Sequence, residues 1–246
     1  METIQVAEIN VKVTFKAIKN IHLSVHPPNG IVTLSAPPRY DLDTLRLYVI
    51  SRLDWVREKI VKFQQQERIP ARNYINNETH YFFGQRFKLF LKETKGKQTI
   101  EKKIDRLIMH VRTASDRNKR ACIMDNWHRK ELKIITKEFV QKWEPKLNVK
   151  VIDFGVKKMK TKWGTCNTKE GRIWLNLELA KMPKHCIEYI VVHEMVHLLE
   201  RSHNKRFVAL LDHHMPGWQM LKDELNSLPL SCELNQLSED VTLEYK

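Results

Sequence analysis

One segment of this chain, residues 188–200 with the sequence EYIVVHEMVHLLE, limits the fold more than any other. Its apolar residues fall on nearly every side of a helix, which predicts that the helix is buried. His193, Glu194 and His197 would then lie inside the protein. Burying imidazole and carboxylate groups is costly unless they are paired or bind an ion. The fold must therefore provide a partner for these three side chains.

The spacing of these groups indicates a metal ion as that partner. Residues four apart lie one above the other on a helix, so His193 and His197 can bind one ion without distorting the backbone. Glu194 would lie beside the open position of the metal, where a general base is needed. This HExxH arrangement is typical of zinc hydrolases. Because the bare motif also recurs by chance, its buried setting is what strengthens the interpretation.

A catalytic zinc site needs a third protein ligand and one position open to water. His203 follows His197 by six residues, which is the third-ligand spacing of the HExxHxxGxxH pattern. That pattern has a glycine where the chain leaves the helix, and this chain has Glu200 there. We therefore expect the turn near Arg201 and Ser202, with His203 as the third ligand.

Four other side chains are weaker candidates for that ligand. His185 lies eight residues before His193, about two helical turns away, which is too far. His213 and His214 could fold back, but they are more typical of a solvated helix end. Glu224 would correspond to the glutamate ligand of other zincins.

Composition limits the setting and the partners. The 246 residues carry a formal net charge of +14, which favours contact with polyanions such as nucleic acid or nucleotides. No segment approaches the ~18 apolar residues of a membrane span, and the N-terminus lacks the apolar region of a secretory signal. The four cysteines are dispersed and form no CxxC pair. We expect a cytoplasmic, reducing setting, free thiols and no membrane partner.

Residues 1–112 are expected to form an N-terminal antiparallel β-rich domain. Alternation of apolar and polar residues predicts strands at 3–15, 20–26, 31–36, 79–92 and 104–112. Helical periodicity predicts one long helix from Asp41 to about Gln66. A polar, lysine-rich connection is expected between the last two strands.

Residues 113–230 are expected to form a second domain, followed by a C-terminal tail at 231–246. A long helix is predicted to begin soon after Thr113 and to end before Pro145. The remaining predicted elements are strands at 149–153, 156–162 and 172–175 and helices at 184–200, 204–213 and 217–227. The fold class is therefore expected to be α+β, with the helix of His193 in the second domain.

The sequence WGTCN at residues 163–167 follows a predicted strand. Trp163 and Gly164 suggest a tight turn that places an aromatic ring over the helix of His193. Cys166 could be a nucleophile, but no neighbour would activate its thiol, and a buried structural thiol is more typical. Asn176, at a strand end, is most simply a helix cap or turn residue.

Several motifs together resemble the YgjP-like metallopeptidases, a family of metal-dependent hydrolases grouped near the SprT-like and Wss1-like zincins. They are KWGTC at 162–166, where the family usually has Ser in place of Thr165, IWLN at 173–176, Pro183, Tyr189, and HEMVH with HLLERSHNKRF up to Phe207. Upstream, KNIHLSVHPPNGIVTLSAP and FFGQRFKLFL are similar to the family's N-terminal strands and hairpin. The resemblance covers about residues 10–225.

This resemblance implies a zincin-like α+β catalytic domain. It implies Zn²⁺ held by His193, His197 and His203, with Glu194 as the base. Its motifs also provide four candidate site-supporting residues, Trp163, Cys166, Asn176 and Tyr189. The substrate stays open, because the family is named for its likeness to peptidases while some members carry a nucleotide pyrophosphatase description.

Three functions follow as hypotheses. The first is a zinc metallopeptidase acting on proteins or peptides, near nucleic acid. Its basic segment would contact polyanions through Lys157, Lys158, Lys160 and Lys162, and Trp143 and Trp163 would stack on bases. A solvated strand face would give the same basic pattern.

The second hypothesis is a metal-dependent pyrophosphatase acting on nucleotides such as UTP, although GQRFK at 84–88 is not a P-loop. The third is a basic nucleic-acid-binding module with structural zinc. Structural zinc sites are usually closed by four protein ligands, and only three good ligands are evident here, which makes this the least expected function.

Overall fold

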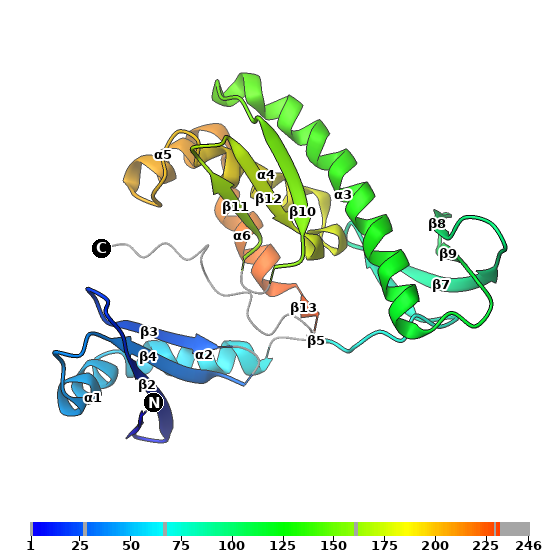
Figure 1. Cartoon of the computed structure of the whole chain (residues 1–246). Helices are drawn as coiled ribbons and strands as arrows, with labels where there is room; N and C mark the ends of the chain where they lie inside the picture. Colours follow the sequence, from blue (N-terminus) through cyan, green and yellow to red (C-terminus); the bar gives the residue numbers. More distant parts are fainter. Residues whose placement is uncertain (1, 27–28, 66–67, 160–161, 229, 232–246) are drawn as a thin grey trace.

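The computed structural model describes residues 2–26, 29–65, 68–159, 162–228 and 230–231. Three sheets of three or four strands and one long helix, α3, dominate the structure (Figure 1), which confirms the predicted α+β class. Within the described ranges, the helices are all too short or too polar to cross a membrane.

The N-terminal sheet contains β1 (Glu2–Val6), β2 (Ile9–Phe15), β3 (His22–His26) and β4 (Ile31–Ala36) in the order β1-β2-β4-β3. The single strand predicted at 3–15 is wrong, because Ala7 adopts a left-handed φ of 50° and the chain turns there. The two outer pairs are antiparallel as expected. The central pair, β2 and β4, is parallel, so the antiparallel prediction is wrong for these two strands.

Two helices, α1 (Leu42–Ile50) and α2 (Leu53–Gln65), replace the single helix predicted from Asp41. The break falls at Ser51, whose hydroxyl donates to the carbonyl of Tyr48 over 2.8 Å and ends α1. Side chains of this type compete with the helical backbone for hydrogen bonds. The two helices and the first sheet enclose a hydrophobic cluster of their own (Figure 1).

The second sheet contains β6 (Thr79–Phe82), β7 (Gln85–Glu93), β8 (Thr99–Lys102) and β9 (Arg106–Val111) in the order β6-β7-β9-β8. The strand predicted at 79–92 is a hairpin, because Phe83 and Gly84 both have positive φ, 46° and 79°, as a two-residue turn requires. The predicted polar connection contains β8. As in the first sheet, the central pair is parallel.

The β6-β7 hairpin is fixed to the segment that leads into the helix of His193. The amides of Phe83 and Gly84 donate to the carbonyls of Ala180 and Lys181, which lie in the 3-10 helix η1 (Leu177–Lys181). A Cβ added to Gly84 would lie 2.9 Å from the Pro183 ring. The turn therefore needs glycine both for its backbone conformation and for this close contact.

Helix α3 (Arg117–Leu147) packs against two hydrophobic clusters. Met124 and Trp127, near its start, complete the core of the second sheet, whereas residues from Leu132 onward belong to the cluster around the third sheet. The domain boundary near Thr113 stays a prediction. The shared core shows only that the second sheet and α3, on either side of that point, pack on each other.

The predicted end of α3 before Pro145 is wrong. The helix continues to Leu147, and Asn148 closes it with a left-handed φ of 51° while its amide donates to the carbonyl of Glu144. The Glu144 carboxylate also accepts from the amide of Val151 over 2.9 Å. These bonds hold the chain at the helix end. The strand predicted at 149–153 is therefore wrong, because residues 149–152 are in no strand and the next strand begins at Asp153.

The third sheet contains β10 (Asp153–Lys157), β11 (Gly164–Asn167) and β12 (Arg172–Asn176) in the order β10-β12-β11. The strand predicted at 156–162 is wrong in its described part, because β10 ends at Lys157, and residues 160–161 lie outside the described residues. The strand predicted at 172–175 is confirmed. β10 is parallel to β12, and β11 is antiparallel to it, which leaves β11 at one edge of the sheet.

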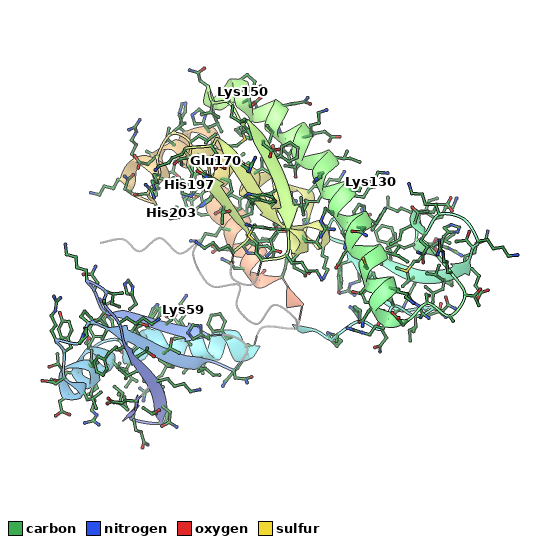
Figure 2. All side chains as sticks on the ribbon, in the orientation of Figure 1. Lys59, Lys130, Lys150, Glu170, His197 and His203 are labelled. Atoms are coloured by element: carbon green, nitrogen blue, oxygen red, sulfur yellow. The ribbon has the colours of Figure 1, made fainter. Side chains whose placement is uncertain are left out.

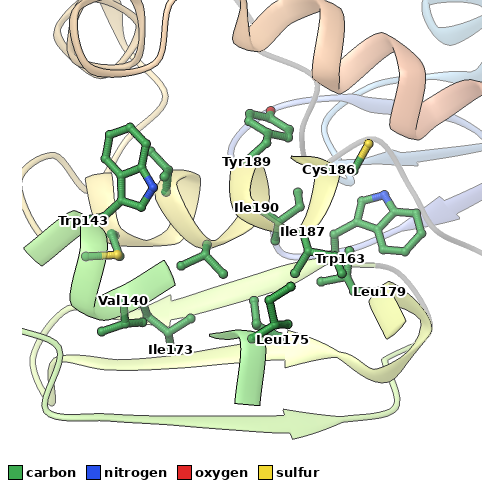
Figure 3. Packing of buried hydrophobic residues seen from close by; sticks show 14 of the residues in the cluster. Val140, Trp143, Trp163, Ile173, Leu175, Leu179, Cys186, Ile187, Tyr189 and Ile190 are labelled. Carbon is green, nitrogen blue, oxygen red and sulfur yellow. The ribbon is translucent and has the colours of Figure 1, made fainter. Parts of the chain in front are cut away.

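Helices α4 (Lys184–Val196), α5 (Lys205–His214) and α6 (Trp218–Ser227) follow close to their predicted positions. Helix α4 packs between α3 and the third sheet, and its apolar residues form the centre of the largest hydrophobic cluster (Figure 3). Two short strands, β5 (Arg68–Ile69) and β13 (Leu230–Ser231), pair in parallel. The buried helix predicted around His193 is thus confirmed.

Candidate metal site

Helix α4 places His193, Glu194 and His197 in adjacent positions near its C-terminal end. His193 and Glu194 are each only 5% exposed. The helix ends at Val196, four residues earlier than predicted, and a turn that begins at His197 leads to Glu200. The carbonyl of Glu200 in this turn accepts from Nδ1 of His197 over 3.2 Å, which directs Nε2 of the ring toward the site.

The turn after α4 brings His203 back toward the helix. The Glu200 carboxylate accepts from the amide of Ser202, and the amide of Asn204 donates to the Ser202 carbonyl. Nε2 of His203 lies 3.0 Å from Nε2 of His193. Figure 2 shows His197 and His203 side by side. The early end of α4 is therefore what allows this return, in place of the glycine found in the HExxHxxGxxH pattern.

Phe207, on the first turn of α5, supports all three imidazoles. Its ring centre lies 4.7–4.9 Å from the ring centres of His193, His197 and His203, and the residue is 1% exposed. Asn204 caps α5 by accepting from the amide of Phe207. This cap fixes the aromatic residue against the histidines.

The three imidazoles fit a metal ion. One ring nitrogen from each of His193, His197 and His203 lies within 4.8 Å of the other two. Ligands on a tetrahedral zinc ion lie about 3.4 Å apart at Zn–N distances of ~2.1 Å, near the 3.0 Å between the His193 and His203 nitrogens. Burial lowers the pKa of His193 and of His197, so both rings are neutral and offer lone pairs.

Glu194 lies against β11, and Gly164 makes this possible. A Cβ added to Gly164 would lie 2.6 Å from Oε1 of Glu194. Burial raises the pKa of Glu194 to about 8, while the nearby charge of Lys162 acts in the opposite direction. The carboxyl group therefore keeps its proton to a higher pH than an exposed glutamate, and a bound cation would act in the same direction as Lys162.

An open cleft of about 240 Å³ exposes this arrangement to solvent. Its floor is formed by α4 and one wall by the segment that contains β11. The lining residues are Lys162, Trp163, Gly164, Thr165, Cys166, Thr168, Ile190, His193, Glu194, His197, Arg201 and His203. All three predicted ligands and the predicted base thus face one cleft.

The four candidate supporting residues have different positions. Trp163 and Cys166 line the cleft. Burial, and next Glu194, raise the pKa of the Cys166 thiol to about 12, which argues against a nucleophile. Tyr189 is fully buried behind His193, with their ring centres 5.9 Å apart.

Asn176 acts as the predicted cap, and it also holds the chain before the cleft. Its side chain accepts from the amide of Glu178 at the start of η1. Its amide nitrogen donates to the carbonyls of Met159 and Lys162 over 3.0 and 2.8 Å. Asn176 therefore fixes the backbone of the segment that contains Lys162 and Trp163.

The alternative third ligands lie elsewhere. Nε2 of His185 lies 2.8 Å from both carboxylate oxygens of Glu224, and with Cys186 these residues form a separate cluster at the other end of α4. The rings of His213 and His214 contact each other at the end of α5. None of the four lines the cleft.

The two tryptophans of the basic segment lack the exposure that the predicted stacking needs. Trp143 and Trp163 are each 5% exposed, so neither ring can stack on a base. Nζ of Lys157 lies over the Trp174 ring and Lys158 forms an ion pair with Asp125 over 2.8 Å. Lys160 lies outside the described residues, and Lys162 lines the cleft. Contact with nucleic acid stays a prediction.

Sequence reasoning missed three residues of the site. Gly164 was part of a recognised motif, but its contact with Glu194 depends on how β11 packs against α4. Phe207 was noted only as an aromatic residue after the turn. Arg201 was used only to place that turn, and its position in the cleft had no signal in the sequence.

The α+β fold thus carries three converging imidazoles that could hold a metal ion. Residues 19–228 match the model of the family described as YgjP-like, metallopeptidase domain. The chain therefore belongs to the YgjP-like metallopeptidase family, as its motifs indicated. No curated protein matches it.

Two solved structures are similar to part of the chain. The metallopeptidase zymogen abylysin of Pyrococcus abyssi is 18% identical, with a TM-score of 0.35, over 37% of this chain and 90% of that one. The metallopeptidase zymogen jannalysin of Methanocaldococcus jannaschii is 22% identical, with a TM-score of 0.33, over 37% and 92%. Family membership rests on the family model alone.

Proposed function

We propose that this protein is a zinc-dependent peptidase in which His193, His197 and His203 hold the metal and Glu194 is the general base. The observation that carries the proposal is the convergence of three imidazoles on an open cleft that also contains the Glu194 carboxyl group. Three nitrogen ligands with a fourth position left open are typical of catalytic zinc.

Each residue has a distinct part in the proposed reaction. Bound zinc would polarise the scissile carbonyl and lower the pKa of its water toward about 7. Glu194 accepts the proton of the attacking water and passes it to the leaving amine. The hydrogen bond from His197 to the Glu200 carbonyl holds that ring in the tautomer whose Nε2 is free to bind.

Hydrolysis of nucleotides is the second candidate. The observation that favours it is the presence of two cationic residues, Lys162 and Arg201, in the cleft, where they could contact phosphate groups. The peptidase is preferred because the family is described as a metallopeptidase family. A purely structural zinc is disfavoured by the open cleft beside three ligands.

The experiment compares wild type, Glu194→Gln and the matched control Glu170→Gln, which changes an exposed glutamate outside the cleft. Zinc content, casein cleavage and pyrophosphate release from a nucleotide panel are measured on each. We expect all three proteins to bind zinc, with cleavage lowered roughly 10²–10⁴-fold in Glu194→Gln alone. Casein cleavage by Glu194→Gln at the wild-type rate would refute the assignment. Pyrophosphate release without casein cleavage would replace the peptidase by the second candidate.

A further inference from the structure

Two cationic side chains flank the candidate metal site on different chain segments. Lys162 precedes β11, and Arg201 lies in the turn between His197 and His203. Both are exposed and both line the same cleft of about 240 Å³. The cleft that exposes the imidazoles is therefore lined by one lysine and one arginine.

The backbone under each cation is held in place. The carbonyl of Lys162 accepts from Asn176, which is itself completely buried. Arg201 lies in a turn anchored by the bond from Ser202 to the Glu200 carboxylate, and its backbone hydrogen-bonds with the His197 ring. The backbone that carries each of the two charged residues is thus fixed in the wall of the cleft.

The charge balance of the cleft is positive. Among the described residues that line it, histidines apart, Lys162 and Arg201 are basic and Glu194 is acidic. Glu194 lies at the floor and is 5% exposed. Two cations exceed one carboxylate even when Glu194 is ionised, and a divalent metal would add to the excess. The net charge of +14 on the whole chain acts in the same direction on approaching substrates.

We propose that Lys162 and Arg201 make the cleft selective for peptides that present a carboxylate beside the scissile bond. This inference rests on the proposed peptidase function and specifies its substrate class. An ammonium and a guanidinium in one cleft are complementary to carboxylates, and lysine side chains of a substrate would be repelled. The carboxylate can belong to an aspartate or glutamate side chain or to the C-terminus of a short peptide.

The test uses the zinc-loaded full chain and peptides that differ at the positions next to the cleaved bond. One set carries Glu, Gln or Lys there with both ends capped, and a second set has a free or amidated C-terminus. The charge-reversed protein is Lys162→Glu/Arg201→Glu. The matched control is Lys130→Glu/Lys137→Glu, which changes two exposed lysines of α3 outside the cleft. Figure 2 shows Lys130 far from His197.

We expect wild type and the control to cleave the Glu peptide roughly tenfold faster than the Lys peptide, and the charge-reversed protein to invert this order. Two exposed ion pairs between the cleft and a substrate can together give about a factor of ten. A preference for the free C-terminus alone, lost in the charge-reversed protein, would assign the recognised carboxylate to the C-terminus.

Separate outcomes overturn the inference and the function. Equal cleavage of all peptides, or a Glu preference that persists in the charge-reversed protein, would overturn the inference while the peptidase stands. Hydrolysis of nucleotides without any peptide cleavage would overturn both. If charge reversal prevents folding, Lys162→Gln/Arg201→Gln replaces it, with loss of the Glu preference as the expected result. Anisotropy of labelled Glu and Lys peptides bound to zinc-loaded Glu194→Gln gives a readout independent of turnover.

Discussion

Buried histidines occur in two parts of this molecule, and they differ in what their nitrogens face. His80 and His128 lie where β6 meets α3, and they are 5% and 2% exposed. Nε2 of His80 lies 2.8 Å from a carboxylate oxygen of Glu78, and His128 hydrogen-bonds with the backbone of Tyr81. Each ring is therefore partnered on one side by a group that the protein itself supplies.

The histidines of the candidate metal site are instead directed at one another. Nε2 of His193 and Nε2 of His203 lie 3.0 Å apart, and among the described residues neither His80 nor His128 belongs to such a group of potential ligands. Burial lowers the pKa in both regions. Burial and a low pKa therefore do not distinguish a ligand from a structural histidine, whereas converging lone pairs do.

The largest predicted effect concerns removal of the metal. Zinc at a thousandfold excess over its Kd should stabilise the folded chain by about 4 kcal/mol, because it binds the assembled site and not the unfolded chain. Thermal unfolding with zinc and with a chelator measures this difference. His80→Ala should keep the zinc-dependent shift, and His193→Ala should lose it. If the thermal unfolding of wild type is the same with zinc and with a chelator, the distinction between the two groups of histidines fails.

The second predicted effect concerns the contact between β11 and the proposed base. Gly164→Ala places a Cβ where Oε1 of Glu194 now lies 2.6 Å away, so the carboxyl group must move. A displacement of about 1 Å in a catalytic group can reduce turnover roughly 100-fold. Peptide cleavage and zinc content are measured together, and zinc should stay bound. Gly96→Ala, where the nearest atom is 3.4 Å away, is the control and should have wild-type activity.

The third prediction uses pH to examine the structural histidines. Burial lowers the pKa of His80 from 6.5 to about 4, more than Glu78 raises it, so the unfolded chain binds a proton at pH 5 that the folded ring does not. The contribution of neutral His80 to the free energy of unfolding should be fully present above pH 6.5. It should fall by about 2 kcal/mol as the pH is lowered to 5. Urea unfolding of wild type and His80→Gln at pH 7.5 and 5 measures the difference. If wild type and His80→Gln lose the same unfolding free energy between pH 7.5 and pH 5, His80 does not titrate in this window.

The smallest predicted effect concerns the cap that supports Phe207. Asn204→Ala removes the side-chain acceptor for the amides of Arg206 and Phe207 at the start of α5. Loss of such a cap destabilises a protein by about 1 kcal/mol. Asp116→Ala, which removes the cap of α3, should have a similar effect on stability. Only Asn204→Ala should also weaken zinc binding, because only that cap adjoins the imidazole cluster, and titration with a zinc indicator measures this.

Most helices and the convergence of the three candidate ligands could be predicted because they depend on local patterns. The spacing of His193 and His197 follows from helix geometry, and α5 and α6 follow from apolar periodicity. The long helix was predicted, but its last turn was missed, because the bonds of Glu144 outweigh the proline signal there.

Pairings between distant segments could not be predicted. The parallel pairs β2-β4 and β7-β9 depend on chain crossovers, and alternation alone does not specify the direction of a neighbouring strand. The same limit applies to the site. Gly164 and Arg201 reach the cleft only through the packing of β11 and the turn after α4, so their roles required the structure.

The most direct test of the central claim is the zinc stoichiometry of wild type, His203→Ala and His128→Ala after purification under reducing, chelator-free conditions. The converging geometry predicts about one zinc per chain in wild type and in His128→Ala, and loss of zinc from folded His203→Ala. Retention of one tightly bound zinc by His203→Ala, or its loss from folded His128→Ala, would contradict the assignment of His193, His197 and His203 as the metal ligands.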